Sequence, residues 1–201
     1  MTKGRLEAFS DGVVAIIITI MVLELRAPHD TSLAALRPLV PVFFSYLLSF
    51  VYVGIYWNNH HHLLHAAHGV NGWILWANLH LLFWLSLFPF ATAWVGENPG
   101  ESGPAAYYGF VLLMASVAYP ILERALIAHH GRDSALERAL RHNRREWISI
   151  TAYALAIPLA IVNAWLSYFL YVSIALLWFL PDRRIETELA GRIPTTGGKQ
   201  P

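Results

Sequence analysis

The stretch RLEAFSDGVVAIIITIMVLEL, residues 5–25, decides what kind of fold the chain can have. Its first half carries Arg5, Glu7, Ser10 and Asp11, and its second half is almost purely aliphatic. At about 1.5 Å per residue, Asp11 lies about 9 Å along a helix axis from Arg5, and the aliphatic half then occupies the membrane interior. Ionisable groups near hydrocarbon are costly and usually face protein or water. The stretch predicts a membrane helix with a functional polar end; a helix start capped by Ser10 and Asp11 is the alternative.

The composition is that of an integral membrane protein. Of the 201 residues, 56% are hydrophobic and only 13% are charged, whereas soluble domains usually carry about a quarter charged residues. The absence of cysteine excludes disulfides, thiol catalysis and cysteine metal sites. The basic residues are not placed to grip nucleic acid. The N-terminus lacks the pattern of a cleaved signal peptide, so we expect the first helix to be retained.

Apolar stretches of membrane-spanning length predict an all-α protein with six transmembrane helices. A turn near Asn163 divides the long apolar run between Trp147 and Leu180 into two of them. Pro120 is expected to kink the fourth helix or to mark where it leaves the membrane. Residues 1–182 form the transmembrane domain, and residues 183–201 form a tail predicted to be disordered. The predicted helices are about 6–25, 38–58, 73–95, 104–128, 147–162 and 164–180.

The basic residues predict the orientation. In a six-helix arrangement, twelve of the fourteen lysines and arginines fall on one side, and only Arg26 and Arg37 fall on the other. The positive-inside rule then places both termini in the cytoplasm of a multi-pass protein of the cell inner membrane. The connection 124–146 is predicted to be a short cytoplasmic helix, or alternatively a segment lying on anionic lipid headgroups.

Placing residues at intervals of about 100° divides the first helix into two faces. One arc contains an apolar stripe, made by Ile16, Thr19, Ile20 and Leu23 and extended by Phe9 and Gly12. The polar residues Glu7, Ser10 and Asp11 lie nearly opposite. The stripe could line a pore, face a symmetry mate or simply contact lipid, and the pattern leaves these open. The Thr19 hydroxyl is able to bond to the carbonyl of Ala15.

A histidine run follows the second predicted span, with members His60, His61, His62, His65 and His68. Its spacing places imidazoles on one helical face, which suits a divalent transition metal. No carboxylate occurs between Tyr56 and Asn78, however, so hydrogen bonding at an interface is the favoured interpretation. No metal or other cofactor is predicted. Nor do the acidic residues and histidines converge on an enzyme signature.

Two polar residues interrupt the third, aromatic-rich span, namely Asn78 and His80. Buried groups of this kind need partners, and Ser10 and Asp11 should lie at a comparable depth. Further candidates for the same network are Asn58 and His61. We therefore expect a polar contact between the first and third helices.

The motifs together resemble those of a known channel family. Residues Arg5-Leu6-Glu7-Ala8-Phe9-Ser10-Asp11 match the Arg-x-x-x-Phe-Ser-Asp signature of the endolysosomal potassium channel family called transmembrane protein 175, and the chain resembles its prokaryotic branch. The resemblance extends to Tyr56-Trp57 before the histidine run, to Phe88-Pro89-Phe90 and to a closing segment at residues 178–182, and so covers nearly the whole chain.

The resemblance implies a homotetramer in a lipid bilayer, with one first helix from each subunit lining a central potassium path. It implies a hydrophobic constriction at Ile16, with Thr19, Ile20 and Leu23 on the same face. The sequence lacks the Thr-Val-Gly-Tyr-Gly carbonyl filter of ordinary potassium channels, as members of this family do. The signature residues Arg5, Phe9, Ser10 and Asp11 are implied to pack the pore helix against its neighbours.

The predicted function is therefore a potassium-preferring cation channel with a hydrophobic constriction, and not an enzyme. Two alternatives stay open. A proton or cation transporter would need a titratable group in the path, which only Asp11 or a histidine could supply. A metal-binding membrane protein or enzyme would need the run His60 to His68 to hold a metal.

Overall fold

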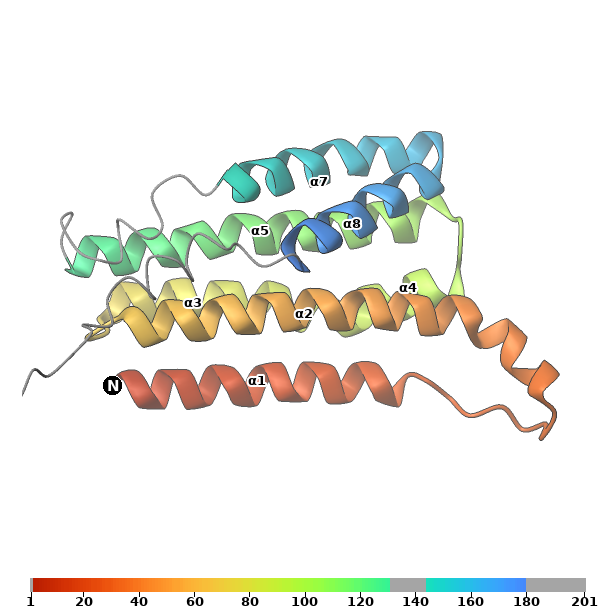
Figure 1. Cartoon of the computed structure of the whole chain (residues 1–201), viewed down its shortest axis with the longest axis horizontal. Helices are drawn as coiled ribbons and strands as arrows, with labels where there is room; N and C mark the ends of the chain where they lie inside the picture. The colour runs from red at the N-terminus through yellow and green to blue at the C-terminus, as the bar shows by residue number, and fades with distance from the viewer. Residues whose placement is uncertain (1, 131–143, 180–201) are drawn as a thin grey trace, which may run out of the picture.

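The computed structural model describes residues 2–130 and 144–179, and within these ranges the secondary structure is entirely helical (Figure 1). The chain therefore has the all-α fold that its composition predicts. The elements are α1 (Lys3–Leu23), the 3-10 helix η1 (Leu33–Leu39), α2 (Val40–Ala66), α3 (Gly72–Ser86), α4 (Phe88–Glu97), α5 (Ser102–His130), α7 (Arg144–Val162) and α8 (Ala164–Phe179).

The helices run up and down in one bundle, with α1 along one edge (Figure 1). The Lys3 ammonium of α1 donates a 3.0 Å hydrogen bond to the carbonyl of His65, so α1 starts beside the end of α2. The Trp178 indole near the end of α8 donates to Ser149 Oγ near the start of α7 at 2.9 Å. Chain direction therefore alternates, and α8 returns toward the end where α1 begins.

Five segments of the described part of the chain are long and apolar enough to cross a membrane; α8, with 16 residues, is shorter. The last two helices separate where the sequence predicts. Helix α7 ends at Val162 and α8 begins at Ala164, so Asn163 forms the turn. Its side-chain oxygen accepts a 2.9 Å hydrogen bond from the amide of Trp165, which caps the new helix. Within the predicted connection 124–146, residues 131–143 lie outside the described part, as does the predicted tail at 183–201.

Some helix boundaries differ from those predicted. Helix α2 does not end near Asn58 but continues to Ala66, because the histidine run remains helical. The third span is broken at Leu87 into α3 and α4, since the ring of Pro89 removes a donor and clashes with the preceding turn. Helix α5 continues through Pro120 to His130, so this proline does not end it.

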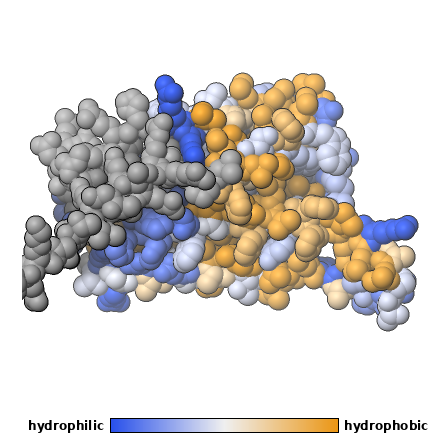
Figure 2. Space-filling view, viewed as in Figure 1, coloured by the Kyte–Doolittle hydropathy of each residue, from blue (hydrophilic) through white to orange (hydrophobic). Residues whose placement is uncertain are grey.

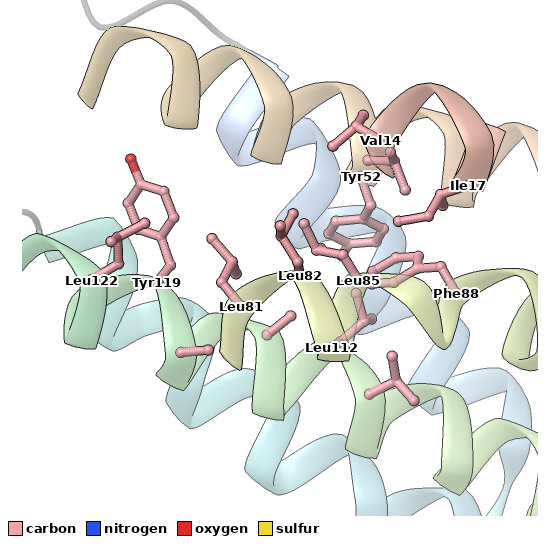
Figure 3. Packing of buried hydrophobic residues seen from close by; sticks show 14 of the residues in the cluster. Val14, Ile17, Tyr52, Leu81, Leu82, Leu85, Phe88, Leu112, Tyr119 and Leu122 are labelled. Carbon is pink, nitrogen blue, oxygen red and sulfur yellow. The ribbon is translucent and has the colours of Figure 1, made fainter. Parts of the chain in front are cut away.

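The core is apolar but carries buried tyrosines. Figure 3 shows Val14 and Ile17 of α1 packed toward Tyr52 and Phe88. The Tyr52 hydroxyl donates to the carbonyl of Tyr171 at 2.6 Å and accepts from the Tyr153 hydroxyl at 3.1 Å, which ties α2 to α8 and α7. On the face shown in Figure 2, apolar side chains cover the middle and hydrophilic residues gather toward the two ends, as a membrane-spanning bundle requires.

Candidate pore helix and its polar attachment

Helix α1 packs against the rest of the chain with one side only. It packs against α2, α3 and α4. The buried side repeats at helical spacing and consists of Leu6, Ser10, Val14, Ile17 and Met21. All its members except Ser10 are apolar, so Ser10 marks the polar point of the interface.

A directed chain of hydrogen bonds joins α1, α3 and α2 at that point. The Ser10 hydroxyl donates to the carbonyl of Leu6 at 2.9 Å and therefore accepts the 3.0 Å bond from Asn78 Nδ2. The Asn78 Oδ1 atom then faces His60 Nε2 at 2.7 Å, and because Oδ1 only accepts, this histidine nitrogen carries the hydrogen. Ser10, Asn78 and His60 are all buried, so each of these bonds satisfies a group that water cannot reach.

Three further polar contacts hold the same end of α1 to α2. The Trp57 indole donates to Asp11 Oδ1 at 2.9 Å. The Glu7 carboxylate lies 3.2 Å from His61 Nδ1, a contact that becomes an ion pair when the histidine is protonated. The Lys3 ammonium reaches the carbonyl of His65, where the negative end of the α2 dipole favours a cation.

The structure therefore brings together only some of the predicted network residues. Ser10 and Asn78 are in direct contact, whereas Asp11 bonds to Trp57 instead of Asn78. His80 accepts a 2.9 Å bond from Trp84 of its own helix, away from the network. Asn58 is exposed and forms no side-chain hydrogen bond with the described residues. His61 contacts Glu7.

The signature residues divide into two pairs. Ser10 and Asp11 are attached to neighbouring helices of the same subunit. Arg5 and Phe9 lie exposed on the subunit surface. Packing within the chain thus accounts for half of the signature, and the other half lies exposed on its surface.

The apolar stripe lies on the exposed side of α1. Ile16 is 59% exposed and Leu23 is 72% exposed, and Thr19 and Ile20 are exposed with them. The exposed face is wider than the predicted stripe, because it also contains Ala8, Ala15 and Val22. The Thr19 hydroxyl donates to the carbonyl of Ala15 at 2.8 Å, which leaves its oxygen lone pairs free to accept.

The sequence patterns do not identify two partners of α1. They place Trp57 only in a motif and His60 only in the histidine run. A usable signal existed, because Trp57 and His61 lie one helical turn apart on α2 and both contact the polar end of α1. The described residues contain no group of three or more histidines, cysteines or carboxylates arranged to hold a metal ion.

The bundle of long apolar helices defines a multi-pass membrane protein. A family model described as endosomal/lysosomal potassium channel TMEM175 matches residues 5–89, which include α1, the histidine run and Asn78. A potassium channel of Chryseobacterium sp. (strain P1-3) is 53% identical over 189 residues, covering 94% of this chain and 98% of the relative. The chain belongs to the TMEM175 channel family.

Other relatives match this chain at lower sequence identity or over a smaller part of its length. A potassium channel of Streptomyces collinus is 31% identical and covers 81% of this chain and 84% of its own. The human protein named endosomal/lysosomal proton channel TMEM175 is 36% identical over 96 residues, 41% of this chain and 19% of that protein. The crystal structure of a lysosomal potassium-selective channel TMEM175 homolog from Chamaesiphon minutus superposes with a TM-score of 0.75 at 26% identity, covering 88% of this chain and 95% of that one. These relatives are named as channels and not as enzymes.

Proposed function

We propose that the protein is a potassium-preferring cation channel, assembled as a homotetramer in which the first helix of each subunit lines a central path. The observation that carries this proposal is the one-sided attachment of α1. Its buried side is fixed to α2, α3 and α4, while the stripe from Ile16 to Leu23 stays open along the membrane-spanning half of the helix.

The conduction path is proposed to lie between subunits. Arg5 and Phe9 belong to the family signature yet lie exposed on the subunit surface, where a symmetry mate would cover them. Two cavities lie among the described residues, and no residue of α1 lines either of them. One is a small chamber between α2, α5, α7 and α8, and the other is an apolar groove of about 650 Å³ between α2, α4 and α8.

Ile16 is proposed to form the constriction. A ring of Ile16 side chains around the axis excludes water at a narrow radius, so ions pass only when the ring widens or rotates. Thr19 lies about one turn further along the same face. Because its hydrogen is used by the Ala15 carbonyl, its oxygen presents lone pairs to a partly dehydrated cation and gives a modest preference for potassium over sodium.

Both termini are proposed to face the cytoplasm from the cell inner membrane. The proposal is supported by the alternating helix directions, which bring α8 back toward the end where α1 begins, and by the basic residues clustered on that side in the sequence. Permeant potassium ions, lipid and further copies of the chain are the proposed partners.

A proton or cation transporter remains the competing function, because several relatives are named proton channels. Asp11 is its natural candidate group. The position of this carboxylate argues against that role, since it bonds to Trp57 on the attached side of α1 and not on the open stripe.

The test is reconstitution of the purified protein in liposomes with opposed potassium and sodium gradients. We expect a passive current whose reversal potential lies toward the potassium equilibrium potential and stays unchanged when only the pH gradient is altered. A reversal potential that follows the proton gradient supports the transporter instead. Absence of ion flux from vesicles that contain assembled protein contradicts the channel function.

A further inference from the structure

An apolar groove of about 650 Å³ runs along the outside of the bundle between α2 and α8, and no residue of α1 lines it. Figure 1 shows α8 beginning at the same end as α2 and running beside its first half. The end of α4 closes the groove at that end, through Val95 and the following Pro99. On the face shown in Figure 2, this part of the surface is largely apolar.

The lining of the groove offers little to hold water. Of its 15 described residues, only Ser45, Trp165 and Tyr168 have polar side-chain atoms. The Ser45 hydroxyl already donates to the carbonyl of Val42 at 2.8 Å. The Tyr168 hydroxyl is buried in the protein, so the ring of this residue forms the wall. Cavities with an apolar lining stay dry and bind apolar ligands, so the groove suits a hydrocarbon chain.

The length of the groove matches one leaflet of a bilayer. Its lining runs from Val40 to Val51 along α2 and from Trp165 to Phe179 along the inclined α8. At 1.5 Å per residue these stretches are about 16 Å and about 21 Å long. Half of a hydrocarbon core is about 15 Å thick. The exposed Trp165 lies at the end where both helices begin, and tryptophan is typical of the interface between membrane and water.

A hydrogen bond holds the two walls together. The Tyr52 hydroxyl of α2 donates to the carbonyl of Tyr171 of α8 at 2.6 Å. Val51 and Val172, the chain neighbours of these two tyrosines, both line the groove. The groove is therefore formed by the fold itself, as binding sites for small molecules usually are.

The mouth of the groove carries charges of both signs. Arg37 of η1 is exposed and lies three residues before Val40, where the groove begins. Glu97, at the end of α4, is also exposed and lies between the lining residues Val95 and Pro99. A zwitterionic phospholipid has a phosphate for the guanidinium and an ammonium for the carboxylate. Its headgroup thus complements the mouth, and its acyl chain complements the groove.

We propose that the groove binds one acyl chain of a zwitterionic phospholipid from the leaflet at that end of the bundle. The phosphate lies beside Arg37 and the ammonium beside Glu97. The chain lies between α2 and α8, where it replaces contacts that an empty apolar groove would lack. The site does not depend on ion conduction, so it goes beyond the proposed channel function.

Native mass spectrometry of the assembled full-length protein with added dioleoylphosphatidylethanolamine tests the acyl-chain site. We expect one lipid retained per subunit. Val172→Trp fills the groove from an exposed position and should lower lipid retention severalfold. Val162→Trp makes the same change at an exposed position outside the groove, so it should retain the lipid. Equal retention by the two variants, or no retained lipid in the unmodified protein, overturns the site.

The same measurement tests the headgroup contact. Arg37→Gln should weaken lipid retention about fivefold, the usual effect of one basic side chain near a lipid headgroup. Arg26→Gln is the matched control, because Arg26 is exposed but follows α1 and is not next to the groove lining in the sequence. Equal retention by these two variants overturns the contact with Arg37.

A single cysteine provides a measurement that does not require filling the groove. The chain has no cysteine of its own, so Leu176→Cys places one bimane label in the groove and Val162→Cys places one outside it. Phosphatidylethanolamine with brominated acyl chains should quench both labels in vesicles, and only the label at position 176 should stay quenched after dilution into detergent. Quenching that is lost at both positions overturns the site. A thiol at position 176 that resists labelling in the assembled protein means that a neighbouring copy fills the groove, which also overturns it.

Discussion

The indole nitrogen of Trp57 on α2 lies 2.9 Å from Oδ1 of Asp11 on α1 and donates a hydrogen bond to it. This contact fixes the depth of the polar end of α1, because the indole is part of a helix that is itself tied to α7 and α8. Bonds to an ionised acceptor are stronger than those between neutral groups, but a half-exposed site weakens the advantage.

Trp57→Phe should therefore destabilise the protein by about 1 kcal/mol. The change removes the donor and leaves the Asp11 carboxylate without its partner on α2. Thermal unfolding in detergent measures it. Trp76→Phe is the matched control, since Trp76 is 71% exposed on α3 and should change the melting temperature little. Equal melting temperatures for the two variants would show that the bond contributes nothing.

Asn78→Ala should be the more costly change. It removes two interhelical hydrogen bonds, one to Ser10 and one to His60, and leaves buried groups unsatisfied. At about 0.6–1.7 kcal/mol for each such bond in membrane proteins, the loss is about 1–3 kcal/mol. Asn58→Ala makes the same chemical change at an exposed site and should be close to neutral. In a double-mutant cycle with Ser10→Ala, the two effects should not add.

Ile16→Asn should raise potassium flux in liposomes severalfold, because a polar ring no longer excludes water from the constriction. Val22→Asn is the control. Val22 is also exposed, at 43%, but lies about 120° from Ile16 around the helix. Equal gains in both variants would mean that the open face of α1 responds generally, and that Ile16 has no special part in the constriction.

Thr19→Val should move the potassium-to-sodium permeability ratio toward one while retaining flux. The substitution keeps the branched shape and removes the oxygen whose lone pairs face the proposed path. The reversal potential under bi-ionic conditions measures the ratio. Thr151→Val, at an exposed position on α7, should leave the ratio unchanged. A Thr19 variant with unaltered selectivity would remove this hydroxyl from cation coordination.

Gly96→Ala should destabilise the contact between α2 and α4 by about 1–3 kcal/mol. A Cβ at Gly96 would lie 2.6 Å from Ser45 Oγ and 2.9 Å from Val42 Cα, and a backbone atom cannot move aside cheaply. Gly54→Ala has open space and should be neutral or stabilising, since alanine favours the helix by about 0.5–1 kcal/mol. The melting temperature of Gly96→Ala should therefore fall, whereas that of Gly54→Ala should stay the same or rise.

The sequence predicts the membrane helices well because their signal is local. Apolar runs set the spans, and the turn at Asn163 is visible in a run too long for one crossing. The break at Leu87 and the extension of α2 to Ala66 are harder, because they depend on whether neighbouring helices stabilise the extra turns. Helix ends are decided by packing as much as by propensity.

The polar attachment of α1 is predictable only in outline. Equal depth suggests that Ser10 and Asn78 meet, and they do. Which residue of α2 completes the network depends on the rotation of that helix, which a nearly uniform apolar pattern does not specify. The pattern therefore does not identify His60 as the residue that bonds to Asn78. Nor does it identify Trp57 as the partner of Asp11.

The polar contacts of α1 are unevenly distributed along the helix, and this distribution determines how the helix can tilt. Among the described residues, the side-chain bonds and ion contacts of α1 to α2 and α3 fall between Lys3 and Asp11. Further along the helix, a weak 3.8 Å contact joins the Thr92 hydroxyl of α4 to the sulfur of Met21. Directional hydrogen bonds thus hold the helix at its polar end, and non-directional apolar contacts hold it over the rest of its length. A small tilt of α1 about this polar end displaces Leu23 more than Ile16 and breaks none of the hydrogen bonds between Lys3 and Asp11 and their partners.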